Sequence, residues 1–134
     1  MFVFQTLIKA NEIHEAGPIG VKPIDYIIRI TTSDIMFAGT DGDVYLNMVG
    51  LKGRTQNRKI GNKGKNDFER GKTDTFTLTA IDLGAIQGIY LSKKGRDDWT
   101  VARVEIDGPG RTYMFDQQPD QKITKEAVKF AVKR

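Results

Sequence analysis

Short segments with alternating apolar and polar residues follow one another along this chain, and glycine, proline or oxygen-bearing residues separate them. The clearest alternation covers residues 73–80, where Phe76, Leu78 and Ala80 alternate with threonines. This period of two residues is typical of a strand with one buried face. Comparable patterns predict strands over residues 24–32, 43–51, 55–60, 85–92, 99–107 and 111–115, and a looser one over 1–10. Many short strands at close spacing indicate an all-β fold, an antiparallel β-sandwich of about eight strands.

The two ends of the chain are less clear. Residues 11–23 are rich in glycine and proline and are expected to form a loop. Near the other end, Ile123, Ala127 and Phe130 suit one face of a helix, whereas Val128 and Phe130 alternate as in a strand. We expect residues 1–10 and 125–133 to form edge strands, paired with each other or across a dimer. That pairing would allow a homo-oligomer through the terminal extensions.

Composition is that of an ordinary globular domain. The 134 residues suit one domain with a single core. The absence of cysteine excludes disulfides and thiolate metal sites. No apolar run approaches the roughly 18 residues of a membrane span, and residues 1–8 lack the basic lead of a signal peptide. We therefore expect a cytoplasmic or peripheral-membrane location.

Positive charge is concentrated in one stretch of a chain whose net charge is +4. Between Lys52 and Lys72 lie eight basic residues, opposed by Asp67 and Glu69. This excess favours an anionic partner such as acidic lipid or an acidic protein, with a solvated basic face as the plainer alternative. Nucleic acid is disfavoured because Phe68 is the one aromatic residue in the stretch. The expected anionic-ligand patch comprises Arg58, Lys59, Lys63, Lys65, Lys93 and Lys94.

The residues needed for hydrolytic catalysis are scarce. His14 is the single histidine, and neither Ser33 nor Ser92 lies in a Gly-x-Ser-x-Gly motif. A Cys–His pair cannot form, and no phosphate-binding or dinucleotide-binding glycine motif is present. Without a nucleophile and a base in a recognisable arrangement, we predict that the chain is not an enzyme.

Two turns are rich in oxygen atoms and glycine. The first, residues 37–43, contains Thr40, Asp41 and Asp43, and the second spans residues 66–76. Such turns are either ordinary tight turns or sites for a hard cation such as calcium. The carboxylates of Asp41 and Asp67 could equally hydrogen-bond backbone amides and hold the two loops together.

Four blocks of sequence resemble the PLAT domain, a β-sandwich module of polycystins, lipoxygenases, animal lipases and clostridial alpha-toxin. The blocks are Ala38 to Asp41, Asn66 to Asp74, Asp82 to Gly84, and Trp99 to Ile106, in the family order. The resemblance covers residues 25–116. It implies a PLAT-like sandwich with an N-terminal extension over 1–24 and a C-terminal extension over 117–134.

The resemblance also implies where calcium would bind. One site would use Thr40 and Asp41 with Asn66 and Asp67. A second would use the carbonyl of Gly39 with Asp97 and the backbone of Asp98, but Phe37 stands where a carboxylate is expected. A third is expected to be lost, because Asn62, Lys63 and Lys65 replace its acidic or small residues.

Docking to a membrane is the usual role of the family, and the apolar residues Ile35, Met36 and Phe37 at a loop tip suit it. The alternative is that Met36 and Phe37 fold under the sandwich and close its end. Trp99 opens an apolar strand and is expected in the core. We therefore predict a non-catalytic module for calcium-assisted docking to an anionic membrane or a partner protein. The alternative function is a protein-interaction module whose calcium loops are vestigial.

Overall fold

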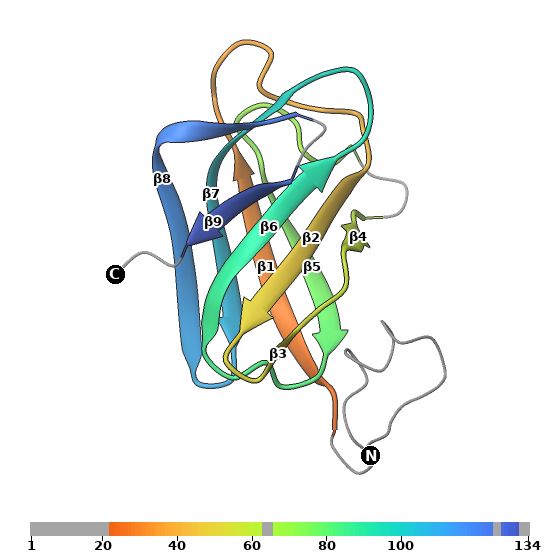
Figure 1. Ribbon diagram of the computed structural model, residues 1–134. Coiled ribbons are helices and arrows are strands. Elements are labelled where there is room, and N and C mark those ends of the chain that lie inside the picture. The colour runs from red at the N-terminus through yellow and green to blue at the C-terminus, as the bar shows by residue number, and fades with distance from the viewer. Residues whose placement is uncertain (1–21, 63–65, 125–126, 132–134) are drawn as a thin grey trace.

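The computed structural model describes residues 22–62, 66–124 and 127–131, and these form nine strands (Figure 1). None of the described residues belongs to a helix that could cross a membrane. The strands are β1 (Ile24–Thr32), β2 (Val44–Gly50), β3 (Gly53–Arg54), β4 (Arg58–Ile60), β5 (Thr73–Ala80), β6 (Ile86–Lys93), β7 (Trp99–Gly108), β8 (Arg111–Ile123) and β9 (Val128–Ala131).

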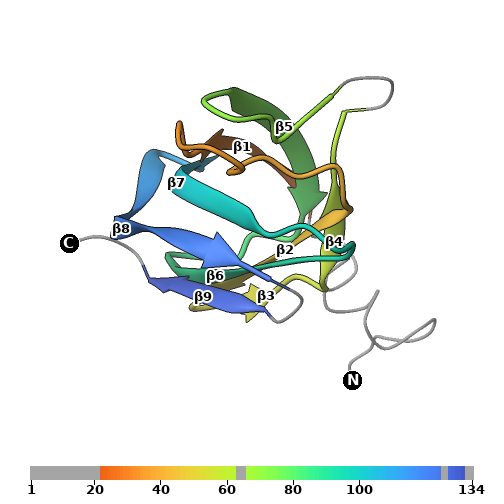
Figure 2. The same ribbon diagram turned by 90° about the horizontal axis from the view of Figure 1, so that it is seen from above.

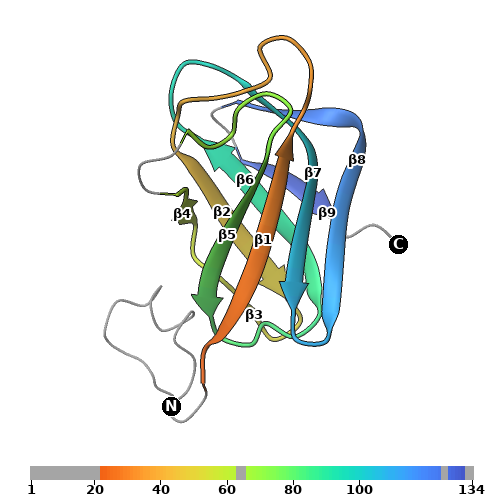
Figure 3. The ribbon, with the colours of Figure 1, turned by 180° about the vertical axis from the view of Figure 1, so that it is seen from behind.

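Two antiparallel sheets pack face to face, which confirms the predicted sandwich (Figure 2). The four-stranded sheet has the order β5-β1-β7-β8 and is seen from its outer side in Figure 3. The five-stranded sheet has the order β3-β2-β6-β9, with β4 paired to β2. Inward-facing residues of both sheets form one core, and its largest fully buried side chains include Trp99, Tyr26, Phe115 and Phe130.

β8 is longer than predicted, and β9 decides between the helix and the strand predicted near the C-terminus. β8 continues past Phe115 to Ile123, although the apolar alternation of Tyr113 and Phe115 is not continued at Gln117. The register against β7 shifts between Val101 and Arg103, so the strand resumes pairing after the irregular segment. Near the C-terminus the strand interpretation is correct, because β9 pairs antiparallel with β6 and buries Phe130. The predicted strand over 1–10, and hence its pairing with the C-terminal segment, lies outside the described residues.

Aromatic side chains close the core at the end where β1 finishes and β7 begins. Phe68 reaches in from the 61–72 loop and lies 4.9 Å from the Trp99 ring and 5.4 Å from the Phe76 ring, measured between centroids. The buried indole N–H of Trp99 donates to the Thr32 hydroxyl at 2.9 Å. Trp99 is therefore a core residue, as expected. The loops above this aromatic layer are those that carry the predicted site residues.

Candidate functional site

Three loops meet at one end of the sandwich, over residues 33–43, 61–72 and 94–98. The first two make direct backbone contact, since the amide of Thr40 donates to the carbonyl of Phe68 at 3.1 Å. Gly39 permits this approach, because a Cβ there would lie 3.0 Å from the same carbonyl oxygen. The structure thus brings together the two oxygen-rich turns that are far apart in the sequence.

The third loop is tied to the first through Asp97. Its carboxylate accepts a hydrogen bond from the Thr40 hydroxyl at 2.7 Å and another from the backbone N–H of Asp41 at 3.1 Å. Burial raises the pKa of the Asp97 carboxyl, but these two bonds and the Lys93 ammonium outweigh it and hold the pKa below its ordinary value. Asp97 is therefore an ionised bridge between loops at neutral pH.

Lys93 does not belong to the expected anionic-ligand patch, because it is buried. Its side chain is fully buried, and its ammonium lies 3.2 Å from Asp97 Oδ1, with the carbonyl oxygens of Gly95 and Asp97 also accepting from it. Lys93 follows Ile89 and Leu91 at intervals of two residues, so it shares their inward-facing side of β6. That spacing was the signal that could have identified it as a buried lysine.

The second predicted calcium site does not fit a divalent cation. The Lys93 ammonium already supplies a positive charge to the Asp97 carboxylate and to the turn around it. Phe37 provides no carboxylate, and the carboxylate of Asp98 pairs with Lys122 at 3.8 Å. Glu69, which was not among the predicted ligands, lines a small cleft here together with Gly39 and Asp97. Its carboxylate does not change the conclusion, because the Lys93 ammonium remains next to Asp97.

The first predicted site lies along a separate cleft. The cleft has a volume of about 200 Å³ and is lined by Thr40, Asp41, Gly42, Asp43, Lys59, Ile60, Gly61, Asn62, Asn66, Asp67 and Phe68. The lining residues include three aspartates and one lysine, and that lysine, Lys59, pairs with Asp43 at 3.2 Å. Carboxylate, amide and hydroxyl oxygens are the ligands that calcium prefers, so the donor set fits this ion.

Asp67 has a second role within its own loop. Its carboxylate accepts hydrogen bonds from the backbone N–H of Asn62 and from the Asn62 side-chain amide, the latter at 3.1 Å. Nearby, Asp74 accepts from the Phe68 amide at 2.8 Å, and desolvation raises the pKa of the Asp74 carboxyl despite this bond.

Among the described residues, no group of three or more His, Cys, Asp or Glu side chains is arranged to hold a metal ion.

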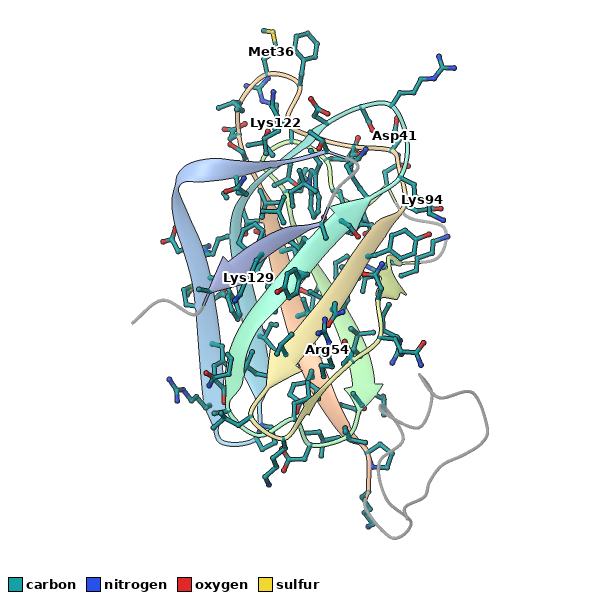
Figure 4. All side chains as sticks on the ribbon, viewed as in Figure 1. Met36, Asp41, Arg54, Lys94, Lys122 and Lys129 are labelled. Carbon is teal, nitrogen blue, oxygen red and sulfur yellow. The ribbon has the colours of Figure 1, made fainter. Side chains whose placement is uncertain are left out.

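We call Ile35, Met36 and Phe37 the apolar tip, and Met36 marks its place at the end of the sandwich in Figure 4. These side chains are 54%, 69% and 87% exposed, respectively. The interpretation in which Met36 and Phe37 close the core is therefore wrong, because Phe68 and Trp99 already do so. Phe37 has a φ of 64°, which is unusual for a bulky side chain and turns it outward at the corner.

The base of the tip is firmly held. The amide of Ala38 donates to the carbonyl of Ile35 and closes the turn, while Ala38 itself is buried. The carbonyl of Ala38 accepts from the amide of Thr100, and the amide of Ser33 donates to the carbonyl of Thr100. The hydroxyl of Ser33 donates to Asp120 at 2.6 Å. The three apolar side chains are therefore presented on a braced turn.

The remaining basic residues of the expected patch are dispersed. Lys59 and Lys94 are exposed on the outer side of the five-stranded sheet, with Lys94 Nζ 5.3 Å from the centre of the Tyr45 ring. Arg58 instead turns toward β5 and donates to the carbonyl of Thr79 at 3.3 Å. Lys63 and Lys65 lie outside the described residues. Arg70, which the sequence analysis left out of the patch, pairs with Asp34 beside the apolar tip at 3.1 Å.

Comparisons with known proteins agree with the fold and with the order of the loops. The family model of the PLAT/LH2 domain matches residues 26–126. The lipoxygenase homology domain-containing protein 1 of Mus musculus is 37% identical over 94 residues, which are 68% of this chain and 4% of that protein. The allene oxide synthase-lipoxygenase protein of Plexaura homomalla is 37% identical over 95 residues, 66% of this chain and 9% of that protein.

Solved structures give the same result. The coral 8R-lipoxygenase, described as activated by calcium through a C2-like domain, has a TM-score of 0.75 and 31% identity, covering 81% of this chain and 17% of that one. The alpha toxin of Clostridium absonum has a TM-score of 0.65 at 18% identity, covering 92% of this chain and 34% of that one, and shows likeness of fold alone. This chain spans a small part of the length of each relative.

Proposed function

The chain belongs to the PLAT/LH2 domain family, and on that premise we propose that it is a non-catalytic module that docks on anionic membranes through its apolar tip. The exposure of Ile35, Met36 and Phe37 carries this proposal. Burying such a side chain in lipid contributes roughly 1.5–3 kcal/mol. Because the turn is braced before binding, little conformational entropy is lost when the tip inserts.

Charge around the tip is mixed. Arg96 is exposed in the neighbouring 94–98 loop, whereas Arg70 is already paired with Asp34 at 3.1 Å. Each Lys or Arg near an anionic membrane adds about 1 kcal/mol of attraction, but the carboxylates of Asp34 and Glu69 close to the tip oppose it. A cation bound at the same end of the sandwich would offset these carboxylates.

Calcium would assist from the cleft between the first two loops. Asp41, Asn66 and Asp67 are the residues that would hold it, with Thr40 beside them. A bound cation would supply positive charge close to the tip and so favour anionic headgroups. Asp41 and Asp67 belong to different loops, so their joint use would also fix the 33–43 loop against the 61–72 loop.

Vesicle co-sedimentation tests the proposal. Phe37→Ala should weaken binding to phosphatidylserine-containing vesicles about tenfold to a hundredfold, from the apolar burial that it removes. Leu51→Ala is the matched control, because Leu51 is another exposed apolar side chain, 72% exposed in the β2–β3 turn at the opposite end. Equal binding by Phe37→Ala and the unaltered chain would refute insertion of the tip.

The contribution of calcium is separable from that of the tip. Asp41→Asn should remove any increase in vesicle binding that calcium causes while leaving the loss due to Phe37→Ala in place. Calcium that binds the folded chain must also raise its melting temperature, by mass action. The control is Asp25→Asn, because Asp25 is at the start of β1, away from the cleft. A melting temperature unmoved by millimolar calcium would exclude the calcium step.

A protein-interaction module with vestigial calcium loops is the second candidate. The position of Lys93 favours this candidate, because its ammonium supplies the positive charge at Asp97 that a calcium ion would otherwise supply. This candidate predicts no binding to phosphatidylserine vesicles with or without calcium. Vesicle binding that depends on Phe37 would exclude it as the sole function.

A further inference from the structure

The two sheets differ sharply in charge. The strands of the five-stranded sheet contain no Asp or Glu but do contain Arg54, Arg58, Lys59, Lys93 and Lys129. The strands of the four-stranded sheet contain six acidic residues, which are Asp25, Asp74, Glu105, Asp107, Asp116 and Asp120. The same four strands also contain Arg29, Arg103, Arg111 and Lys122, so their net charge is 4 − 6 = −2, against +5 for the strands of the five-stranded sheet. Acidic side chains are therefore confined to the strands of one sheet, and the strands of the other are strongly basic.

Strand register places four cations and two tyrosines on the outer side of the five-stranded sheet. Lys59 is beside Tyr45 across the β4–β2 pair, and Lys129 is beside Tyr90 across the β9–β6 pair. Arg54 is opposite Val49 at the far end of β2, and Lys94 directly follows β6. We call Arg54, Lys59, Lys94, Lys129, Tyr45 and Tyr90 the basic sheet face; Figure 4 looks onto it.

Two of the cations are positioned by the tyrosine rings. The ammonium of Lys94 is 5.3 Å from the centre of the Tyr45 ring, and the guanidinium carbon of Arg54 is 5.9 Å from the centre of the Tyr90 ring. Such cation–π contacts restrict long side chains that would otherwise sample many conformations. The nearest carboxylate along β2 is that of Asp43, which is paired with Lys59. Most of the positive charge of the face is therefore not neutralised by neighbours on its own strands.

We propose that the basic sheet face is a docking surface for an acidic segment of a protein. Charge complementarity selects an anionic partner.

Two observations disfavour the other anionic partners. Bases of single-stranded nucleic acid bind by stacking on open aromatic faces, but cations already lie over the rings of Tyr45 and Tyr90. A membrane that contacts the apolar tip would meet the end of the sandwich, whereas Arg54 is on the order of 20 Å further along β2 at about 3.3 Å per residue. The face is thus available while the tip is engaged, and the proposal does not depend on membrane docking.

Fluorescence anisotropy of a labelled oligoglutamate peptide with the full chain tests the proposal. Arg54→Glu combined with Lys129→Glu should weaken peptide binding about tenfold, from two exposed charge contacts. The matched control is Arg103→Glu with Arg111→Glu, which makes the same change in net charge on the four-stranded sheet and, like Arg54, includes an arginine over a tyrosine ring. The control and Phe37→Ala should both retain peptide binding.

Several outcomes would overturn the proposal. Equal weakening by the two double variants would show attraction to net charge alone. Tighter binding of oligothymidylate or of phosphatidylserine vesicles than of the peptide, lost in the Arg54/Lys129 variant, would assign the face to nucleic acid or lipid. Self-association by light scattering that the same variant abolishes would assign it to a second copy of this chain. If the reversed charges prevent folding, Arg54→Gln with Lys129→Gln makes the same comparison against Arg103→Gln with Arg111→Gln.

Discussion

Replacing Lys93 by methionine should destabilise the fold by about 1–3 kcal/mol. Methionine keeps most of the apolar stem and its packing but removes the ammonium from Asp97 and the surrounding carbonyls. Truncating one member of a fully buried ion pair costs about 3–5 kcal/mol. Here the Asp97 side chain is 45% exposed, so water partly replaces the lost partner. The expected loss of about 1–3 kcal/mol is also smaller because methionine removes the unfavourable burial of an ammonium.

Thermal melting followed by circular dichroism measures this loss. For a domain of this size, about 1–3 kcal/mol corresponds to a melting temperature lower by roughly 4–12 °C at neutral pH. Lys94→Met is the control, because Lys94 is the adjacent lysine but is exposed over the Tyr45 ring. It should change stability by less than about 1 kcal/mol.

The pH dependence distinguishes the ion pair from simple packing. The folded pKa of Asp97 lies below its ordinary value of 3.8. Its ionised form therefore contributes stability that is complete above pH 3.8 and is lost as the pH falls through the lower folded pKa. The stability difference between the chain and Lys93→Met should shrink over that acidic range. A difference that is absent at neutral pH, or constant down to full protonation of Asp97, would refute the assigned role of Lys93.

The other predictions concern the aromatic layer and the contact between loops. Thr32→Val should cost about 1–3 kcal/mol in denaturant unfolding, because it leaves the buried indole N–H of Trp99 without an acceptor; an unchanged unfolding midpoint would contradict this. Gly42→Ala should cost about 2 kcal/mol or more, since the new Cβ would lie 1.9 Å from the carbonyl oxygen of Lys94 and must displace backbone. Gly110→Ala is its control, with a φ of 67° but no atom within 4 Å, and should cost about 1 kcal/mol from backbone strain alone.

Alternation of apolar and polar residues was sufficient to predict the sandwich, because each half-buried strand repeats every two residues. β5 coincides with the predicted segment, and β1 does so as well. The pattern failed beyond Phe115, because Gln117 stands where an apolar residue is due, but pairing with β7 resumes at Gln121 after a shift of register. Pairing between strands depends on residues distant in sequence, so a local pattern cannot anticipate it.

The candidate site was harder to predict, since charge alone does not say which way a side chain points. Grouping the lysines by sequence placed Lys93 on the surface, although its place in the alternation of β6 directs it inward. Asp67 was identified as a calcium ligand, but its hydrogen bonds to Asn62 depend on loop geometry that no local sequence pattern encodes. The predicted patch included Lys59 and Lys94 of the basic sheet face but not Arg54 and Lys129, because strand pairing brings these residues to one surface from several strands.

The backbone at Phe37 has a consequence for the stability of the folded chain. A bulky residue in the left-handed region has a higher conformational energy than glycine or asparagine would have there. Its ring is almost wholly in water, so the folded state gains little from keeping it there. Folding alone therefore does not explain a phenylalanine at this corner, whereas the proposed contact with a membrane would use the exposed ring.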